Sequence, residues 1–460
     1  MYHSFPHYEA KARQHGVVAF VIALVQSGGN TEDLNVQQRR FVDSVMPAVK
    51  NALAWHAAAT EEAAEPHRRQ ALEENRVAVC LGPPGTGKSF AMHCCIEATL
   101  ALGGQVLLTA PTAQLVSRMR KRYGNRLHID TCSAAYGLME DATNPAAATG
   151  HSGFYALEVI DEDSQLSAEN FDRIVKFWCD RDRVCALAFC GDRFQMAGMG
   201  DRRPWDSRLW ATLCFKTQLH VLYRCKDPAY NEMLQAIRTA TPDAAMVKKF
   251  KKHSVWPQRE PTVDDVRRLL LKHPNTTIMS FTRRGASLIN TLALQAKHPR
   301  KAPVATLPGD AESHPDNYVH GKLKSVLELR PMPVPIYIGM PLYLTKNVMK
   351  SVDYVNGMLA TVQFYNERTG GLRVRTDTGH SVLITPWTDP ELDNLTYYPI
   401  RPGFASTVMK FQGAELDHVT LYMDCPGVPG GAYTAASRVR HGSHFKIGGP
   451  IAAEYFTPAR

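Results

Sequence analysis

The chain has 460 residues, of which 44% are hydrophobic and 21% charged, values that are ordinary for a folded protein in water. This length suits roughly two to four domains, each with its own core, and excludes a small disulfide-stapled or a disordered chain. Lys and Arg number 53 against 44 Asp and Glu, and the formal charge of +9 gives a modest indication of a polyanionic partner.

The cysteine content and the short apolar runs indicate in which cellular compartment the protein is expected. Ten cysteines are present without any Cys-x-x-Cys pair, which favours free thiols and argues against structural zinc. The apolar run 17–24 is too short to span a bilayer. We therefore expect an intracellular protein of a reducing compartment (nucleus, mitochondrion or cytoplasm) with no membrane segment. Residues 1–30 are predicted to be an N-terminal appendage that docks a protein partner.

From about residue 31 to 215, short apolar runs alternate with helical patterns, which is typical of a parallel α/β sheet. The predicted strands are 76–81, 105–110, 156–160 and 184–190. Each is followed by polar residues. Because ligands of such sheets bind at the carboxyl ends of the strands, we expect the functional residues there.

The first of these strands leads into a glycine-rich segment, Leu81–Ser89, which is followed by a predicted helix from Phe90. Such a strand–loop–helix segment binds nucleotide phosphates through backbone N–H groups and the helix N-terminus. Lys88 is expected to reach the β- and γ-phosphates of ATP, and the Ser89 hydroxyl to ligate Mg²⁺. The predicted nucleotide-binding residues of the loop are Gly82, Pro83, Gly85, Thr86, Gly87, Lys88 and Ser89. The chain is therefore predicted to hydrolyse ATP.

Three further positions in this region carry residues suited to ATP chemistry. Asp161 and Glu162 end an apolar strand, and we assign Asp161 to Mg²⁺ and Glu162 to the attacking water as general base. Gln195 follows another strand end and is predicted to sense the γ-phosphate. Gln38, ahead of the loop, is predicted to contact the adenine through its amide.

A second alternating pattern begins at about residue 218, with a predicted strand at 276–280 and a predicted helix at 283–298. Between them and the C-terminal part lie a Pro-rich run and a stretch of period-two strands with turns at Asn356-Gly357 and Gly370-Gly371. The predicted domains are 31–215, then 216–300 together with 401–460, a Pro-rich connection at 301–335 and an inserted β-barrel at 336–400. Arg224 and Arg438 are placed in the second domain, from which they would stabilise the charge of the transition state.

In this order the motifs resemble those of superfamily 1 helicases of the 5′-to-3′ branch, closest to the Pif-one/RecD-like group. The resemblance runs from about 34 to 446. The matching segments are Gly82–Ser89, Leu108–Thr112, Asp161–Glu162, Ser164–Trp178, Gly191–Gln195, Leu222–Arg224, Ser406–Gly413 and Tyr433–Arg440. It implies an α/β fold of two RecA-like parallel-sheet domains, with a small Src-homology-3-like β-barrel inserted in the second. It also implies ATP hydrolysis between those domains by a monomeric translocase.

The resemblance also implies contacts with single-stranded DNA and duplex junctions, and roles in DNA repair, replication or recombination. Thr112, Thr131 and Lys410 occupy strand-contacting motifs of the family, and Gly413 falls in a motif that we assign to the nucleotide. Phe194 and Phe411 are predicted stacking platforms, with a core position as the alternative. A wedge that splits duplex is expected at 140–153. The basic run 248–253 is predicted to be a solvated helix face, with a nucleic-acid patch as the alternative.

Some positions depart from the family pattern. Ala113 stands where glycine is usual, Thr131-Cys132-Ser133 where Thr-x-His is usual, and Met409-Lys410-Phe411 where His-Lys-Ser is usual. These positions face nucleic acid in the family, so they leave the substrate preference open. Phe411–Gly413 and Asp161–Gln165 also resemble the Upf-type RNA helicases of the same branch, which keeps RNA open as a substrate. Two other functions stay open for a chain with this phosphate loop, a ring-forming ATPase remodeller and a nucleic-acid-binding module without activity.

Overall fold

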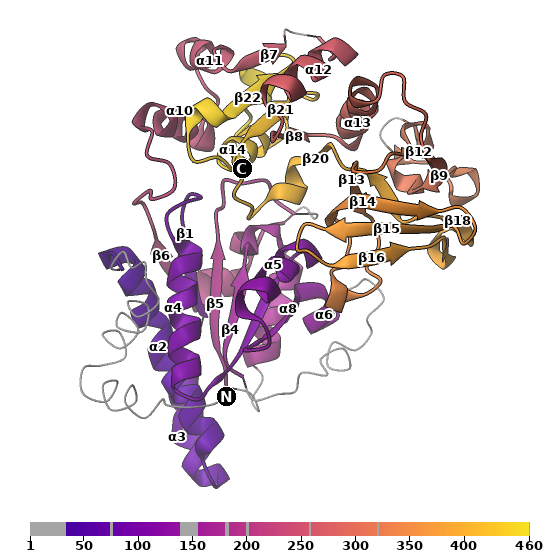
Figure 1. Cartoon of the computed structure of the whole chain (residues 1–460). Coiled ribbons are helices and arrows are strands. Elements are labelled where there is room, and N and C mark those ends of the chain that lie inside the picture. The colour runs from indigo at the N-terminus through magenta and orange to yellow at the C-terminus, as the bar shows by residue number, and fades with distance from the viewer. Residues whose placement is uncertain are drawn as a thin grey trace. The chain divides into compact units, whose positions relative to one another are not determined.

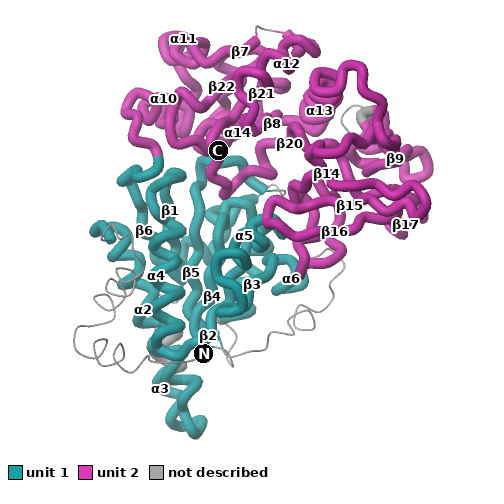
Figure 2. The backbone as a smooth tube through the Cα atoms, in the orientation of Figure 1, with its two compact units in different colours: residues 1–224 teal, residues 225–460 magenta. Residues whose placement is uncertain are grey.

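The computed structural model describes residues 34–73, 77–138, 155–179, 184–198, 202–256, 259–319 and 322–459 (Figure 1). The chain divides into two compact units, residues 1–224 and 225–460 (Figure 2). The predicted appendage at 1–30 and the predicted wedge at 140–153 lie outside the described residues. Each unit is described in turn.

Unit 1 is built on a six-stranded sheet in which all neighbouring strands are parallel, in the order β3-β2-β4-β5-β1-β6. The strands are β1 Val77–Leu81, β2 Gln105–Ala110, β3 His128–Thr131, β4 Tyr155–Asp161, β5 Ala186–Gly191 and β6 Cys214–Gln218. The helices are α2 Val36–Ala57, α3 Glu61–Glu73, α4 Lys88–Ala101, α5 Ala113–Tyr123, α6 Cys132–Tyr136, α8 Ala168–Cys179 and α9 Arg208–Leu213.

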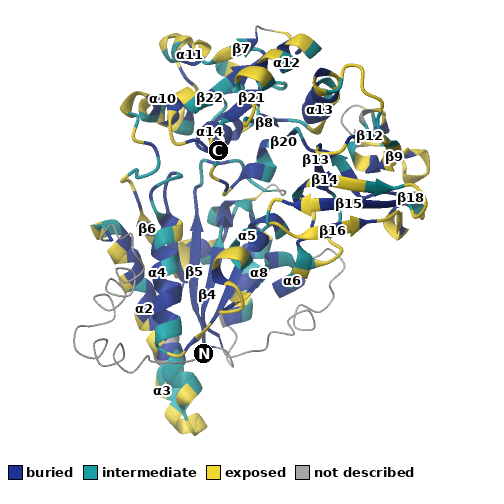
Figure 3. Ribbon diagram, in the orientation of Figure 1, coloured by how far each residue is buried: buried dark blue, intermediate teal, exposed yellow. Residues whose placement is uncertain are grey.

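Alternate residues of each central strand pack into separate cores on the two faces of this sheet. In β1, Ala78 and Cys80 pack with residues of α2, α4 and α5. Val77 and Val79 pack into the other core, with residues of α6, α8 and α9. Every residue of β1 and β5 is buried (Figure 3), as expected for central strands of a parallel sheet with both faces covered.

The four strands predicted in this region are confirmed, but β3 and β6 were missed. Both are edge strands that carry polar residues, His-Ile-Asp-Thr and Cys-Phe-Lys-Thr-Gln, so neither shows a continuous apolar run. β6 pairs with β1 and therefore belongs to unit 1. The boundary consequently falls after Arg224, which corrects the predicted boundary at 215.

Unit 2 contains a second parallel sheet, of five strands in the order β20-β8-β21-β22-β7. The strands are β7 Ser254–Trp256, β8 Thr277–Ser280, β20 Ala405–Thr407, β21 Val419–Tyr422 and β22 Phe445–Gly448. The helices are α10 Pro228–Thr239, α11 Ala244–Lys251, α12 Val263–Lys272, α13 Arg283–Lys297 and α14 Gly431–Ala436. The predicted strand and helix at 276–298 are confirmed. In α11, Phe250 is buried while Lys248 and Lys251 are exposed, which supports the solvated-face interpretation.

The segment between α13 and β20 forms an antiparallel β insertion, as predicted. Its main sheet has the order β16-β15-β14-β13-β19, and three two-stranded ladders accompany it. The strands are β9 Ala305–Gly309, β10 Tyr318–Val319, β11 Lys322–Leu323, β12 Met332–Ile336, β13 Pro341–Leu344, β14 Leu359–Asn366, β15 Gly371–Thr376, β16 Ser381–Ile384, β17 Trp387–Asp389, β18 Leu395–Tyr397 and β19 Ile400–Pro402.

The Pro-rich stretch 301–335 is not an irregular connection, which corrects that prediction. Its strand β9 pairs with β12, and Pro308 lies opposite Pro333 in this ladder. In a two-stranded ladder each strand has an edge, so positions exist where proline's missing N–H costs no hydrogen bond. The β insertion therefore begins near β9 and ends with β19.

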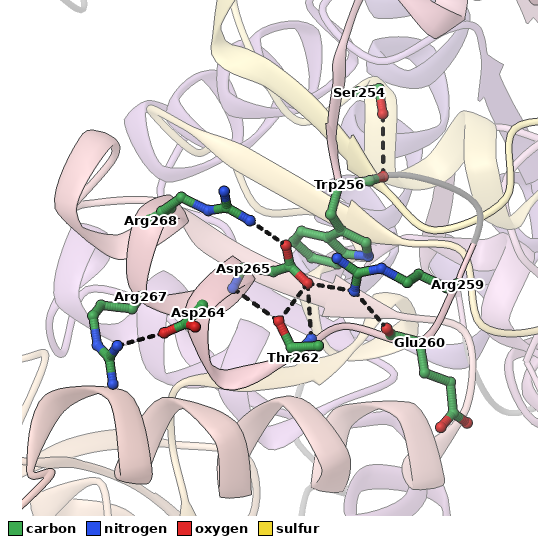
Figure 4. Close-up of polar contacts among 9 residues, drawn as sticks. All are labelled: Ser254, Trp256, Arg259, Glu260, Thr262, Asp264, Asp265, Arg267 and Arg268. Carbon is green, nitrogen blue, oxygen red and sulfur yellow. Dashed lines mark hydrogen bonds and ion pairs between the residues drawn. The ribbon is translucent and has the colours of Figure 1, made fainter.

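The start of α12 shows how polar side chains fix an element of unit 2 (Figure 4). Thr262 and Asp265 form a capping box, in which the Thr262 N–H donates to Asp265 Oδ2 at 2.9 Å. Arg259 and Arg268 donate to the same carboxylate. The hydrogen bond from Arg259, more than any other contact, lowers the pKa of Asp265. The buried carboxylate thus joins the loop before α12 to its first turn.

Among the helices in the described part of the chain, none is long and apolar enough to cross a membrane.

Candidate functional site

The glycine-rich loop of unit 1 leaves the carboxyl end of β1, which lies between β5 and β6 in the sheet. Gly85 and Gly87 have φ of 85° and 82°, a region that side chains with a Cβ rarely adopt. A Cβ on Gly87 would lie 2.2 Å from Gln38 Nε2, and one on Gly85 would lie 2.4 Å from the Cβ of Arg224. The backbone here is therefore folded too tightly for other residues, as a loop around phosphates requires.

The ammonium of Lys88 lies within this loop and is largely buried. Its Nζ donates to the carbonyl oxygens of Gly82 at 2.7 Å and Pro83 at 3.2 Å. The hydroxyl of Thr86 also donates to the Pro83 carbonyl, at 2.8 Å. Ser89 is the second residue of α4, which begins at Lys88. Lys88 and Ser89 thus lie together at one helix N-terminus, where an anion is favoured.

The acidic run Asp161–Asp163 begins at the last residue of β4, and within it Glu162 and Asp163 are buried and Glu162 is strained. Asp161 ends the strand, and its Oδ1 accepts the N–H of Glu162 at 3.0 Å. Glu162 has φ 57° and ψ 46°, the left-handed conformation, which costs a non-glycine residue about 1–2 kcal/mol. Such strain is kept mainly where function needs it, and Glu162 is the predicted general base.

The electrostatics of this run fit a bound cation. Burial and, to a smaller extent, the neighbouring Glu162 carboxylate raise the pKa of Asp161 to about 7, although Lys88 opposes the shift. Burial likewise raises the pKa of Asp163 to about 7. Within the described part of the chain, Glu162 Oε2 and both carboxylate oxygens of Asp163 are buried and accept no hydrogen bond. Buried oxygens of this kind match the preference of Mg²⁺ for carboxylate ligands.

The described Asp, Glu, His and Cys residues contain no cluster of three or more that could hold a metal without other ligands. Mg²⁺ in nucleotide sites is usually held by only one or two carboxylates, together with water and the phosphates of the substrate. Ser89 and Asp161 therefore suffice as its predicted protein ligands.

Two glutamines are assigned to the nucleotide, Gln38 to the adenine and Gln195 to the γ-phosphate, and these roles stay predictions. Gln38 lies in the first turn of α2, and its Nε2 donates to the carbonyl oxygen of Thr86 at 3.0 Å. Gln195 is 2% exposed, in the turn after β5. That strand end lies beside the acidic run, because a Cβ on Gly191 would be 1.8 Å from Asp163 Oδ1. Gln38 is thus hydrogen-bonded to the phosphate loop, and Gln195 follows the strand end that lies beside the acidic run.

The two predicted catalytic arginines differ from expectation. Arg224 ends unit 1 instead of lying in the second domain, and its N–H donates to the Gly85 carbonyl at 3.3 Å. Arg438 does lie in unit 2, but it is 1% exposed, and its guanidinium donates to the carbonyl oxygens of Thr434 and Ala414. The Arg438 guanidinium thus binds backbone carbonyl groups of unit 2, and its catalytic role stays a prediction.

In unit 1, the residues assigned to nucleic acid lie at the same sheet edge as the phosphate loop. Thr112 caps α5 by accepting the N–H of Leu115, and Thr131 caps α6 by accepting that of Ala134. Their strands, β2 and β3, are neighbours. Phe194 is half-buried beside Gln195.

In unit 2, Lys410 lies in a short helical turn after β20 and donates to Asn356 Oδ1 at 3.2 Å, in the turn before β14. Burial, with repulsion from Arg401 and Arg283, lowers the pKa of Lys410 to about 8, although the nearby carboxylates of Asp310 and Glu312 oppose the shift. Phe411 is 5% exposed, so its ring packs in the interior and the core alternative is favoured over a stacking platform. Gly413 follows with φ 73°.

Sequence reasoning missed three residues of these sites. Asp163 was visible as the third acid of one run, but nothing local marked it as buried beside β5. Arg283 and Arg401 lie more than 100 residues apart in the chain, and only the fold brings them to Lys410.

Two RecA-like parallel sheets, one with a phosphate-binding loop and an acidic run at its carboxyl edge, define the fold of a P-loop nucleotide hydrolase. A family model described as an AAA domain matches residues 59–256. No curated protein sequence matches the chain. Among solved structures, Bacteroides Pif1 bound to ssDNA has a TM-score of 0.62 at 14% identity, over 93% of this chain and 94% of that one.

Two further solved structures of Pif1 helicases have a similar fold. Pif1 helicase from Candida albicans has a TM-score of 0.60 at 18% identity, covering 86% of this chain and 96% of its own. A structure of two coordinating Pif1 helicases unwinding forked dsDNA has a TM-score of 0.60 at 16% identity, covering 87% and 94%. The chain therefore has the fold of the Pif1 helicases, which confirms the fold that the resemblance drawn from its motifs implies.

Proposed function

We propose that this protein is an ATP-dependent DNA helicase that moves 5′-to-3′ along single-stranded DNA and unwinds duplex. One observation carries the proposal. The phosphate loop and the strained acidic run lie at the carboxyl edge of a parallel sheet, in a fold shared almost end to end with Pif1 helicases solved with ssDNA and at forked DNA.

Each residue of unit 1 has a role that its position supports. Lys88 leaves the loop carbonyls to bind the β- and γ-phosphates, and Gln38 positions the loop through its bond to Thr86. Ser89 and Asp161 hold Mg²⁺, which when bound neutralises charge on the phosphates. Glu162 orients the attacking water and accepts its proton.

Strand binding is assigned to residues in both units. Thr112 and Thr131 present helix N-termini at the edge of the unit 1 sheet. In unit 2, Lys410, Arg283 and Arg401 lie near one another between β20 and the insertion, where three cations face the carboxylates of Asp310 and Glu312. A phosphate there would relieve the repulsion among the three cations, because it favours their charged forms.

A ring-forming remodeller would have one α/β domain with a helical lid. The second parallel sheet and the antiparallel insertion contradict that function. A binding module without activity is disfavoured because Lys88, Ser89, Asp161 and Glu162 are all present, at the start of α4 and the end of β4.

The test is ATP hydrolysis measured with and without nucleic acid. We expect strong stimulation by single-stranded DNA, and loss of hydrolysis in Lys88→Ala. Lys50→Ala, which removes an exposed lysine of α2, is the matched control and should behave as wild type. Equal or greater stimulation by RNA of the same sequence would overturn the preference for DNA and favour an Upf-type activity.

A further inference from the structure

A carboxylate lies in the middle of β4, the strand whose last residue is Asp161. Every residue of β4 before Asp161 is buried (Figure 3), and Glu158 is 0% exposed. The residues on either side of it, Leu157 and Val159, are apolar. A strand that is covered on both faces normally carries apolar residues throughout, so the fold alone does not account for an acid at this position.

Three hydrogen-bond donors from three other elements contact this carboxylate. The Thr109 hydroxyl in β2 donates to Glu158 Oε1 at 3.1 Å. The hydroxyl of Tyr136, the last residue of α6, and the indole N–H of Trp178 in α8 donate to Oε2. Burial raises the pKa of Glu158 to about 7, although these hydrogen bonds oppose the shift, and no cation of the described residues is among the groups that change it. One side chain therefore joins β4 to β2, α6 and α8.

A gain in stability does not account for Glu158. Even buried ion pairs can often be replaced by apolar residues without loss of stability, and a buried carboxylate without a cationic partner is more costly still. A fully hydrogen-bonded network in the interior does, however, hold its members in one arrangement. Glu158 therefore gives the four elements a fixed geometry instead of additional stability.

The elements that Glu158 joins carry the predicted functional residues of unit 1. β4 ends three residues later, at Asp161. β2 leads to Thr112, which caps α5, and α6 begins after its cap Thr131. α6 has five residues and is therefore about 7–8 Å long, so a shift at its cap displaces the Tyr136 hydroxyl at its other end. The carboxylate thus connects the predicted nucleic-acid contacts with the predicted Mg²⁺ ligand.

We propose that Glu158 is a positioning residue, which couples the predicted nucleic-acid contacts of unit 1 to the acidic run through Tyr136 and Thr109. This role rests on the proposed function, since it identifies the side chains through which bound DNA changes the rate of hydrolysis. A DNA phosphate at the N-terminus of α6 moves this short helix, and the Tyr136 hydroxyl passes the movement to β4 and so to Asp161. Coupling between two sites is reciprocal, so bound ATP would change the affinity for DNA through the same contacts.

The test is steady-state ATP hydrolysis by the full chain, with and without a saturating oligothymidylate. Tyr136→Phe removes the hydroxyl that joins α6 to Glu158 and leaves the ring in place. The stimulation ratio, which is the rate with DNA divided by the rate without it, should fall at least about fivefold, the lower end of typical coupling between two sites. Hydrolysis without DNA, and the affinity for DNA without nucleotide, should each stay within about twofold of wild type, because the phosphate loop, the acidic run and both caps are unchanged.

Glu158→Gln separates the geometry from the charge. Its amide oxygen can accept from Tyr136 and Trp178, and its NH₂ group can donate to the Thr109 hydroxyl, so the network stays complete. The stimulation ratio of Glu158→Gln should therefore stay within about twofold of wild type. Glu158→Leu, which has no acceptor, should lose stimulation as Tyr136→Phe does. If Glu158→Leu unfolds early in a thermal scan, the comparison of Tyr136→Phe with Glu158→Gln remains decisive.

The matched control is Tyr397→Phe in the β insertion. The Tyr397 hydroxyl is also buried and also donates to a buried carboxylate, that of Asp389, at 2.7 Å. This variant loses the same kind of hydrogen bond outside unit 1, and its stimulation ratio should be that of wild type.

An unchanged stimulation ratio in Tyr136→Phe would overturn the inference, even if both rates fall, because equal losses mark a purely structural role. An equal loss of stimulation in Tyr397→Phe or in Glu158→Gln would overturn it as well. The proposed function is tested by the wild-type rates. A wild-type protein without stimulation refutes the motor and this inference together, whereas a stimulated wild type with an equally stimulated Tyr136→Phe refutes the inference alone.

Discussion

Replacing Asp163 by Asn should stabilise the nucleotide-free protein at pH 8. The side chain is 1% exposed, and neither of its oxygens accepts a hydrogen bond within the described part of the chain. Burial raises its pKa from 3.8 to about 7, and at about 1.4 kcal/mol per pKa unit the ionised form costs about 4 kcal/mol at pH 8. A buried Asn amide costs about 1–3 kcal/mol itself, which leaves a net gain of about 1–3 kcal/mol.

The pH dependence gives the prediction its sign. Because the pKa of Asp163 is higher in the folded than in the unfolded chain, the folded state binds the proton more tightly, and wild-type stability falls as the pH rises from about 4 to about 7. At pH 5 the cost in the wild type is only about 1.6 kcal/mol, which the buried amide offsets. The gain from Asp163→Asn should therefore be clear at pH 8 and close to zero at pH 5.

Urea unfolding followed by tryptophan fluorescence, at both pH values and with EDTA present, measures this difference. Glu62→Gln removes an exposed carboxylate from α3 and serves as the control, with no change at either pH. A variant that is no more stable than wild type at pH 8, or that is stabilised equally at both pH values, would refute the electrostatic account of the acidic run.

Three other predictions follow from single positions. Gly87→Ala should add about 1–2 kcal/mol of backbone strain at a φ of 82° and bring a Cβ against Gln38. ATP hydrolysis should fall about tenfold or more in a steady-state assay, while the melting temperature falls by only about 2–8 °C. Asp265→Ala should lower the free energy of unfolding of unit 2 by about 1–2 kcal/mol at pH 7 through loss of the α12 cap, and an unchanged urea midpoint would contradict it. The pKa of Asp161 near 7 means that its metal-binding carboxylate is lost as pH falls, so the apparent Mg²⁺ affinity, titrated by ATP hydrolysis, should weaken up to about tenfold between pH 8 and pH 6.

The sequence reveals the strands that carry chemistry because these strands are apolar and central. β1, β2, β4 and β5 are buried on both faces, so their runs stand out, whereas the polar edge strands β3 and β6 do not. The loop at Lys88 was equally visible, because its glycines and its flanking strand and helix are local features.

What the sequence could not reveal depends on contacts between distant segments. β6 pairs with β1, and that pairing moves Arg224 into unit 1 beside Gly85. The burial of Arg438 depends on the carbonyl oxygens that surround it, which no motif specifies. The outward position of Phe364 depends on one bulge, which reverses the alternation that the pattern predicts.

The measurement that tests the central claim most directly compares unwinding of two duplexes that differ only in the tail, one with a single-stranded 5′ tail and one with a 3′ tail. The account predicts ATP-dependent strand separation of the 5′-tailed duplex, none of the 3′-tailed duplex, and none of either by Lys88→Ala. Unwinding of only the 3′-tailed duplex, or of neither by a protein whose ATP hydrolysis is intact, would contradict it.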